Sequence, residues 1–140
     1  MGAWDVGPFD NDPAGGLLDE LESVGTDRIP VVLSERFRAL IDSAEELDNW
    51  DVSEVVAGAA LVAHRLSGEI EVSPYAEDFL DAHRFEVTDD LRALAKQSLL
   101  RVLKPESNEW YDLWVSSDGM DEVRTELEPF IRVLAGGRDA

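Results

Sequence analysis

The chain contains no cysteine, only two histidines and only two lysines among its 140 residues. The absence of cysteine excludes disulfides, thiolate zinc sites and cysteine nucleophiles. No apolar run approaches the ~20 residues that a membrane-spanning helix needs, and no basic stretch precedes an apolar one near the N-terminus. We therefore expect a cytoplasmic protein with neither a membrane span nor a secretory signal.

Short motifs of common catalytic and nucleotide-binding sites are also missing. The sequence has no GxxxxGK[ST] or GxGxxG loop and no Gly-x-Ser-x-Gly nucleophile turn. Its two histidines, His64 and His83, do not have the HExxH spacing of a zinc hydrolase. We expect no cofactor and no metal, and a non-enzymatic role ahead of a catalytic one.

Positive charge is scarce, with 12 basic residues against 31 acidic ones and a formal net charge of −19. Nucleic acids and anionic membranes repel such a surface unless a local basic patch overcomes its field, and the sequence contains none. Direct nucleic-acid binding and membrane binding are therefore not expected. Two interpretations of the acidity remain open. It either complements a basic protein partner or serves as a solvated, salt-adapted surface.

What the chain does have is helical periodicity. Apolar residues recur with helical spacing in most segments, whereas strict alternation is almost absent. We predict one all-α domain over residues 1–140, with six or seven short helices between residues 12 and 135. We expect residues 1–11 to form an N-terminal clasp and residues 136–140 to form a tail. Residues 69–72 are expected to form at most one brief extended segment.

Several predicted helix boundaries rest on capping residues. Ser34 predicts the start of a helix whose apolar face continues to Leu47. Asp51 with Glu54 predicts the start of the next helix, which is rich in Ala and Val on nearly every side and is therefore expected to be central and buried. Pro129 lies inside the last apolar stripe and predicts a kink or a division into two short helices.

The first twelve residues, MGAWDVGPFDND, combine large aromatic side chains with turn-forming and carboxylate residues. The structural interpretation has Trp4 and Phe9 as apolar anchors on either side of a Gly7-Pro8 turn, with Asp12 capping the first helix. A calcium loop fits poorly because the fifth and twelfth positions, Ala14 and Leu21, offer no side-chain oxygen. Alternatively, the first twelve residues form a surface that binds a partner. Including two tryptophans from the SNEWYDLW segment, the candidate residues for a structural motif or an interaction surface are Trp4, Asp5, Gly7, Pro8, Phe9, Asp10, Asn11, Asp12, Trp110 and Trp114.

This opening stretch resembles the N-terminal signature of a bacterial family known as domain of unknown function 4259. Members begin Met-Gly-x-Trp-Gly-x-Gly-Pro-Phe-x-Asn-Asp, and the matching residues here are Met1, Gly2, Trp4, Gly7, Pro8, Phe9, Asn11 and Asp12. Asp5 departs from the signature, which has glycine at that position. The segments AGAALVAHRLSG and LLRVLKPESNEWYDLW are also similar to the family. The resemblance implies a small bacterial helical protein and carries no activity, cofactor or catalytic residue.

Three functional hypotheses follow. The first is a non-enzymatic, acidic interaction protein, for example an inhibitor or immunity-type protein, that binds a basic protein. The second is a small hydrolase or metal-dependent enzyme with a site formed by Asp10, Asp12 and His64, and a variant of it pairs Asp5, Asp10 and Asp12 for acid–base chemistry. The third is a DNA-mimicking decoy, which requires acidic residues spaced like phosphates along one face.

Overall fold

The computed structural model describes residues 12–68 and 74–136, and the following statements concern these residues. They form seven α-helices and one short 3-10 helix, Thr26–Arg28. The α-helices are α1 Asp12–Val24, α2 Ile29–Ile41, α3 Asn49–Leu66, α4 Pro74–Ala82, α5 Asp89–Val102, α6 Glu109–Ser116 and α7 Met120–Leu134. The all-α prediction is therefore confirmed. The predicted extended segment at residues 69–72 and the N-terminal clasp lie outside the described residues.

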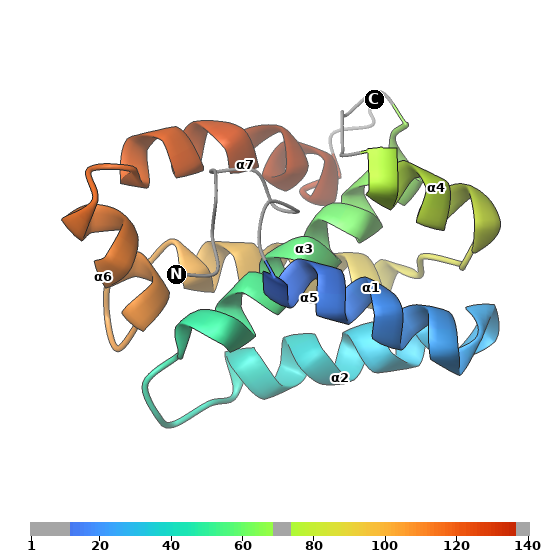
Figure 1. Cartoon of the computed structure of the whole chain (residues 1–140), viewed down its shortest axis with the longest axis horizontal. Coiled ribbons are helices and arrows are strands. Elements are labelled where there is room, and N and C mark those ends of the chain that lie inside the picture. Colours follow the sequence, from blue (N-terminus) through green and yellow to red (C-terminus); the bar gives the residue numbers. More distant parts are fainter. Residues whose placement is uncertain (1–11, 69–73, 137–140) are drawn as a thin grey trace.

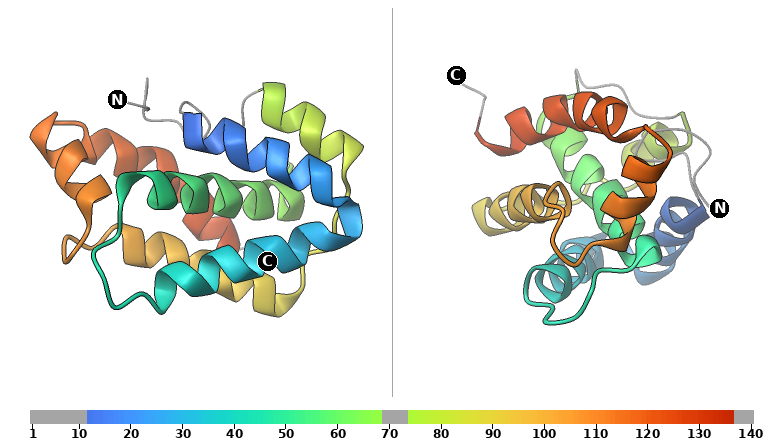
Figure 2. Two further views of the ribbon diagram at one scale, coloured as in Figure 1. Left: turned by 60° about the horizontal axis from the view of Figure 1, so that its bottom comes forward. Right: turned by 90° about the vertical axis from the view of Figure 1, so that its left-hand side faces the viewer.

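Helix α3 forms the centre of the molecule. It packs against α1, α2, α4, α5, α6 and α7, and Figure 2 shows it enclosed by α1, α2, α5 and α7. Nearly every residue from Val52 to Ala63 is buried, because small Ala and Val side chains allow neighbouring helices to approach on several sides. The expectation of a central, buried helix is confirmed.

Glycine at one position of α3 permits a particularly close approach. A methyl group added at Gly58 would lie 3.0 Å from Leu33 Cδ2 on α2 and 3.6 Å from Leu17 Cδ2 on α1. This residue therefore allows α1 and α2 to pack closely against the same part of α3. The shared α1–α2–α3 packing also sets the position of the polar side chains described below.

The predicted boundaries of the second and third helices were wrong. Helix α2 begins at Ile29, five residues before Ser34, because Pro30 occupies the first helical turn, where its missing N–H costs no hydrogen bond. The helix ends at Ile41, so Leu47 lies in the following loop. The N-cap of α3 is Asp48, whose carboxylate accepts a hydrogen bond from the Asp51 N–H at 2.8 Å.

The buried side chain of Leu47 is explained by pairing with a distant loop. The Leu47 N–H donates to the Ser107 carbonyl at 2.8 Å, and the Glu109 N–H donates to the Leu47 carbonyl at 2.9 Å. These bonds form a parallel bridge between Leu47 and Asn108. The side chain of Asn108, 1% exposed, donates to the Val102 carbonyl and accepts from the Tyr111 N–H. The α2–α3 loop is thus attached to the α5–α6 loop.

Pro129 lies inside one continuous helix, so the alternative of two short helices was wrong. Pro129 is exposed. Thr125, whose carbonyl would have accepted the missing N–H bond, is also an exposed residue of α7. The apolar face of α7, including Val123, Leu127 and Phe130, remains buried.

Candidate binding groove between helices α2 and α3

The loop that joins α2 to α3 lies at the lower left of Figure 1. Residues of this loop and of both helices line a groove. It encloses about 470 Å³, within the range of ligand-binding clefts. We call it the α2–α3 groove, and its lining residues are Arg36, Ala39, Leu40, Ser43, Glu46, Leu47, Asp48, Trp50, Asp51, Glu54 and Val55.

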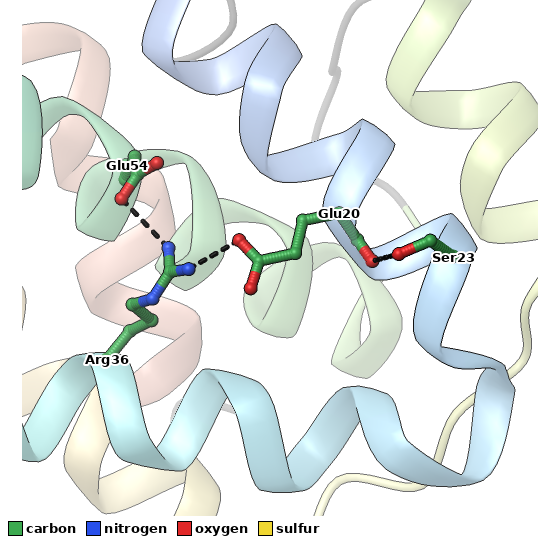
Figure 3. Close-up of polar contacts among 4 residues, drawn as sticks. All are labelled: Glu20, Ser23, Arg36 and Glu54. Carbon is green, nitrogen blue, oxygen red and sulfur yellow. Dashed lines mark hydrogen bonds and ion pairs between the residues drawn. The ribbon is translucent and has the colours of Figure 1, made fainter.

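The guanidinium of Arg36 links three helices beside this groove. Its Nη1 donates to Glu54 Oε1 of α3 at 2.8 Å, and its Nη2 pairs with the carboxylate of Glu20 on α1. Figure 3 shows the guanidinium between the two carboxylates. In the same view, the Ser23 hydroxyl donates to the Glu20 backbone carbonyl at 2.7 Å. The single positive charge of the groove is thus already shared between two carboxylates.

Glu54 is the most enclosed carboxylate of the groove, with 17% of its side chain exposed. Its burial raises the pKa of the carboxyl above the ordinary value, and the negative charges of Asp51 and Glu20 raise it further. The Arg36 charge and a hydrogen bond from the Trp50 indole act in the opposite direction and lower the pKa. The net effect is a raised pKa of Glu54, so the positive charge of Arg36 does not compensate for burial of the carboxyl group.

The pKa of Asp51 is also raised. Partial desolvation is the largest cause, although the residue as a whole is exposed, and the negative charge of Asp48 is the second. A side-chain hydrogen bond with Asp48 raises the pKa of Asp51 further, whereas Arg36 lowers it. Two neighbouring carboxylates of the groove, Asp51 and Glu54, are therefore both less easily ionised than in water.

Trp50 adds an aromatic surface to this acidic groove. It is the second residue of α3 and remains 52% exposed. Its indole is one of the groups that lower the pKa of Glu54, so it lies close to this carboxyl group. Much of the apolar area of the ring is accessible to a binding molecule.

The residues predicted from the N-terminal motif cannot be placed. Trp4, Asp5, Gly7, Pro8, Phe9, Asp10 and Asn11 lie outside the described residues. Asp12 is the first residue of α1 and is exposed. On α6, Trp110 lies in the core at 5% exposure, and Trp114 is partly buried against it. Neither tryptophan lines the α2–α3 groove.

The Asp10, Asp12 and His64 hypothesis stays a prediction because Asp10 is not described. His64 lies in the last turn of α3. Among residues 12–68 and 74–136, no three His, Asp or Glu side chains are grouped so that they could hold a metal ion. The other histidine, His83, connects α4 to the end of α1: its Nδ1 lies 3.0 Å from the Thr26 hydroxyl, and its Nε2 lies 3.9 Å from Glu22.

Sequence reasoning missed the groove itself. Asp48, Asp51 and Glu54 are three residues apart, and Trp50 lies outside the apolar stripe of the helix. This pattern indicates an acidic helix face carrying an exposed tryptophan, a signal that was available. Asp51 and Glu54 were interpreted only as a capping pair, and the role of Arg36 depends on partners in two other helices.

Exposed acidic residues occur on all seven described helices rather than on one face. Examples from four of them are Asp19 on α1, Glu35 on α2, Asp90 on α5 and Asp121 on α7. This scatter does not reproduce a linear series of phosphates and counts against the DNA-mimicking alternative. In the part of the chain that the structure describes, no helix is long and apolar enough to cross a membrane.

A family model, domain of unknown function (DUF4259), matches residues 2–126. No curated protein and no solved structure matches the chain. The matched segment contains the whole α2–α3 groove and covers most of the sequence, and the chain therefore belongs to the DUF4259 family.

Proposed function

We propose that this chain is a non-enzymatic, acidic interaction protein, of the inhibitor or immunity type, that acts in the cytoplasm by binding a basic protein through the α2–α3 groove. The observation that carries the proposal is the charge of the groove. Its lining has four carboxylates, from Glu46, Asp48, Asp51 and Glu54, against one guanidinium from Arg36, a local net charge of −3.

The raised pKa values of Asp51 and Glu54 support this proposal. They indicate that ionised carboxylates in the groove lack compensating positive charge. A cationic side chain from a partner would supply that charge and stabilise both ionised forms. The half-exposed indole of Trp50 would add contact area at the same place.

Affinity capture tests the proposal directly. The wild-type chain and two variants are immobilised, exposed to a lysate of the source bacterium at low salt, and eluted with a salt gradient. The groove variant is Asp48→Asn/Asp51→Asn/Glu54→Gln, in which asparagine at position 48 retains N-cap capacity. The matched control is Asp121→Asn/Glu122→Gln/Glu126→Gln on α7, which loses the same number of charges from an exposed acidic face.

We expect a basic protein to be retained by the wild type and by the α7 control but not by the groove variant. Its release at moderate salt would indicate an electrostatic interface. If the groove variant and the wild type retained the same proteins with the same elution profile, the α2–α3 groove would not be the binding surface and the proposal would fail.

A further inference from the structure

The α2–α3 groove brings three kinds of chemical surface together. Its lining includes the buried apolar side chains Leu40, Leu47 and Val55, which are 3–5% exposed. The same lining contains four carboxylates and the exposed indole of Trp50. A ligand that fills this groove must therefore present positive charge, a flat apolar face and an aliphatic portion together.

The carboxylates of the groove differ in whether they form an ion pair with a cationic side chain. Glu54 has Arg36 at 2.8 Å. For Glu46, Asp48 and Asp51, no cationic side chain of the described residues lies within ion-pair distance. The Asp51 N–H donates to Asp48 Oδ1 at 2.8 Å, so the two side chains lie close together. An entering cation would meet two neighbouring carboxylates that form no ion pair with any other described residue.

We infer that the α2–α3 groove receives an arginine side chain of the basic partner, with its guanidinium against the Trp50 ring and paired with Asp48 and Asp51. The inference rests on the proposed function and names the chemistry of the partner residue. A guanidinium is planar and weakly hydrated, and it donates hydrogen bonds in its plane while its face stacks on an aromatic ring. A lysine ammonium is strongly hydrated and is not planar, so it cannot combine in-plane hydrogen bonds with stacking on an aromatic ring.

The chain's own arginines illustrate the same chemistry. Arg36 already divides its guanidinium between carboxylates of two helices next to the groove. Arg65 lies over the Phe85 ring at 5.8 Å, and Arg124 lies over the Tyr111 ring at 5.6 Å while donating to its hydroxyl. Trp50 provides the strongest cation–π surface of the three aromatic types and has no such arginine among the described residues.

The test is a nuclear magnetic resonance titration of the full ¹⁵N-labelled chain with two capped peptides, Gly-Gly-Arg-Gly-Gly and Gly-Gly-Lys-Gly-Gly, at equal ionic strength. We expect the arginine peptide to shift the Trp50 indole N–H signal and the backbone signals of Asp48 and Asp51. Its affinity should exceed that of the lysine peptide by about twofold to fivefold, and Trp50→Leu should remove that preference. The Trp50 signal is assigned by its loss in the same variant.

The α7 control Asp121→Asn/Glu122→Gln/Glu126→Gln should bind the arginine peptide as the wild type does. Equal affinities for the two peptides, or shifts located away from the groove, would overturn the inference.

Failure of this inference can be distinguished from failure of the proposed function. A partner lost from the groove variant in the capture experiment would still support a basic-protein interface even if the arginine preference were absent. An arginine preference at Trp50 without any such partner would support only the ligand chemistry.

Discussion

At the scale of single residues, Glu54 links stability to pH. Its carboxyl has a folded-state pKa above the ordinary value of 4.5, mainly because it is buried. The folded state therefore holds this proton at pH values where the unfolded chain has released it. The resulting stabilisation is fully present below about pH 4.5 and is lost as the pH rises through the folded-state pKa.

Replacing this carboxyl by a neutral amide should remove that pH dependence. We expect Glu54→Gln to gain stability relative to the wild type as the pH rises from about 4 to about 7, because only the wild type then carries a poorly compensated charge. Urea unfolding of both proteins at several pH values measures the difference in the free energy of unfolding. The control is Glu35→Gln, an exposed residue of α2 that does not line the groove, and it should show a smaller trend. A constant difference between Glu54→Gln and wild type would contradict the prediction.

Asn108 is a second residue whose environment determines its effect on stability. Its amide donates to two carbonyls at the end of α5, those of Val102 at 2.8 Å and Lys104 at 3.1 Å, and its carbonyl caps α6 by accepting from Tyr111 N–H at 3.0 Å. Because the side chain is buried, truncation leaves these backbone groups without partners.

We expect Asn108→Ala to lower the free energy of unfolding by about 2–4 kcal/mol, since it removes a cap together with the donor to one buried and one partly buried carbonyl. The control is Thr88→Ala, which removes an N-cap with a single bond to Leu91 N–H and should cost about 1 kcal/mol. Thermal and urea unfolding of both variants provide the comparison. Equal losses in the two variants would mean that the bonds to the α5 carbonyls contribute little.

At the scale of elements, the corner between α6 and α7 is built from a Schellman motif. The Asp118 N–H donates to the Val115 carbonyl at 3.1 Å, and the Gly119 N–H donates to the Trp114 carbonyl at 2.9 Å. Asp118 adopts the left-handed conformation with φ of 61°. Gly119 lies so close to Trp114 that an added methyl group would be 2.6 Å from its ring.

We therefore predict that substitutions at positions 118 and 119 have opposite effects on the stability of the protein. Gly119→Ala should destabilise the protein by about 1–3 kcal/mol, because the indole ring of Trp114 must move. Asp118→Gly should stabilise it by up to about 1 kcal/mol, because glycine adopts this φ without steric cost. Denaturant unfolding together with Trp114 fluorescence would measure both effects. If Gly119→Ala left stability and fluorescence unchanged, the close contact would not be present in solution.

Most of the elements were predictable from the sequence because their information is local. Helical periodicity predicted the helices, and capping is local as well, because the Thr88 side chain at the N-cap of α5 accepts from the Leu91 N–H three residues later. The predicted helix boundaries were wrong where contacts with residues distant in the sequence determine the structure. Leu47 continues an apolar stripe but leaves the helix, because its backbone pairs with Ser107 and Glu109, about 60 positions later.

The groove was not predictable for the same physical reason. Periodicity places Arg36 and Glu54 on helix faces, but it does not show that Arg36 contacts α1 and α3 at once. The burial that raises the pKa of Glu54 depends on how three helices pack. The local signal of this site in the sequence was the three-residue spacing of Asp48, Asp51 and Glu54 together with Trp50 outside the apolar stripe.

At the scale of the whole molecule, negative charge surrounds a core centred on α3. The formal net charge is −19 with all 12 basic residues counted, so ion pairing cannot balance the excess of acidic residues. Repulsion among the remaining acids destabilises the folded state relative to the expanded unfolded chain. Exposed pairs such as Glu128–Arg132 contribute little against this repulsion.

We therefore expect added salt to stabilise the protein. Raising NaCl from about 0.02 M to about 0.5 M should raise Tm by roughly 5 °C, because screening weakens the repulsion more than it weakens the few exposed ion pairs. Choline chloride should act equally if screening is the cause, since its bulky cation is a poor ligand for carboxylate sites. Calorimetry in both salts makes the comparison. A fall in Tm would show that attractive pairs dominate the surface.

The backbone bridge between Leu47 and Asn108 has a consequence for protein synthesis. The segment that forms one wall of the α2–α3 groove is translated early, but Ser107 and Glu109, which hold it, follow about 60 residues later. At typical translation rates this delay is on the order of several seconds. A nascent chain that already contains α2 and α3 therefore lacks the bonds that complete this wall. The complete α2–α3 groove therefore forms late in translation, after most of the chain has been made.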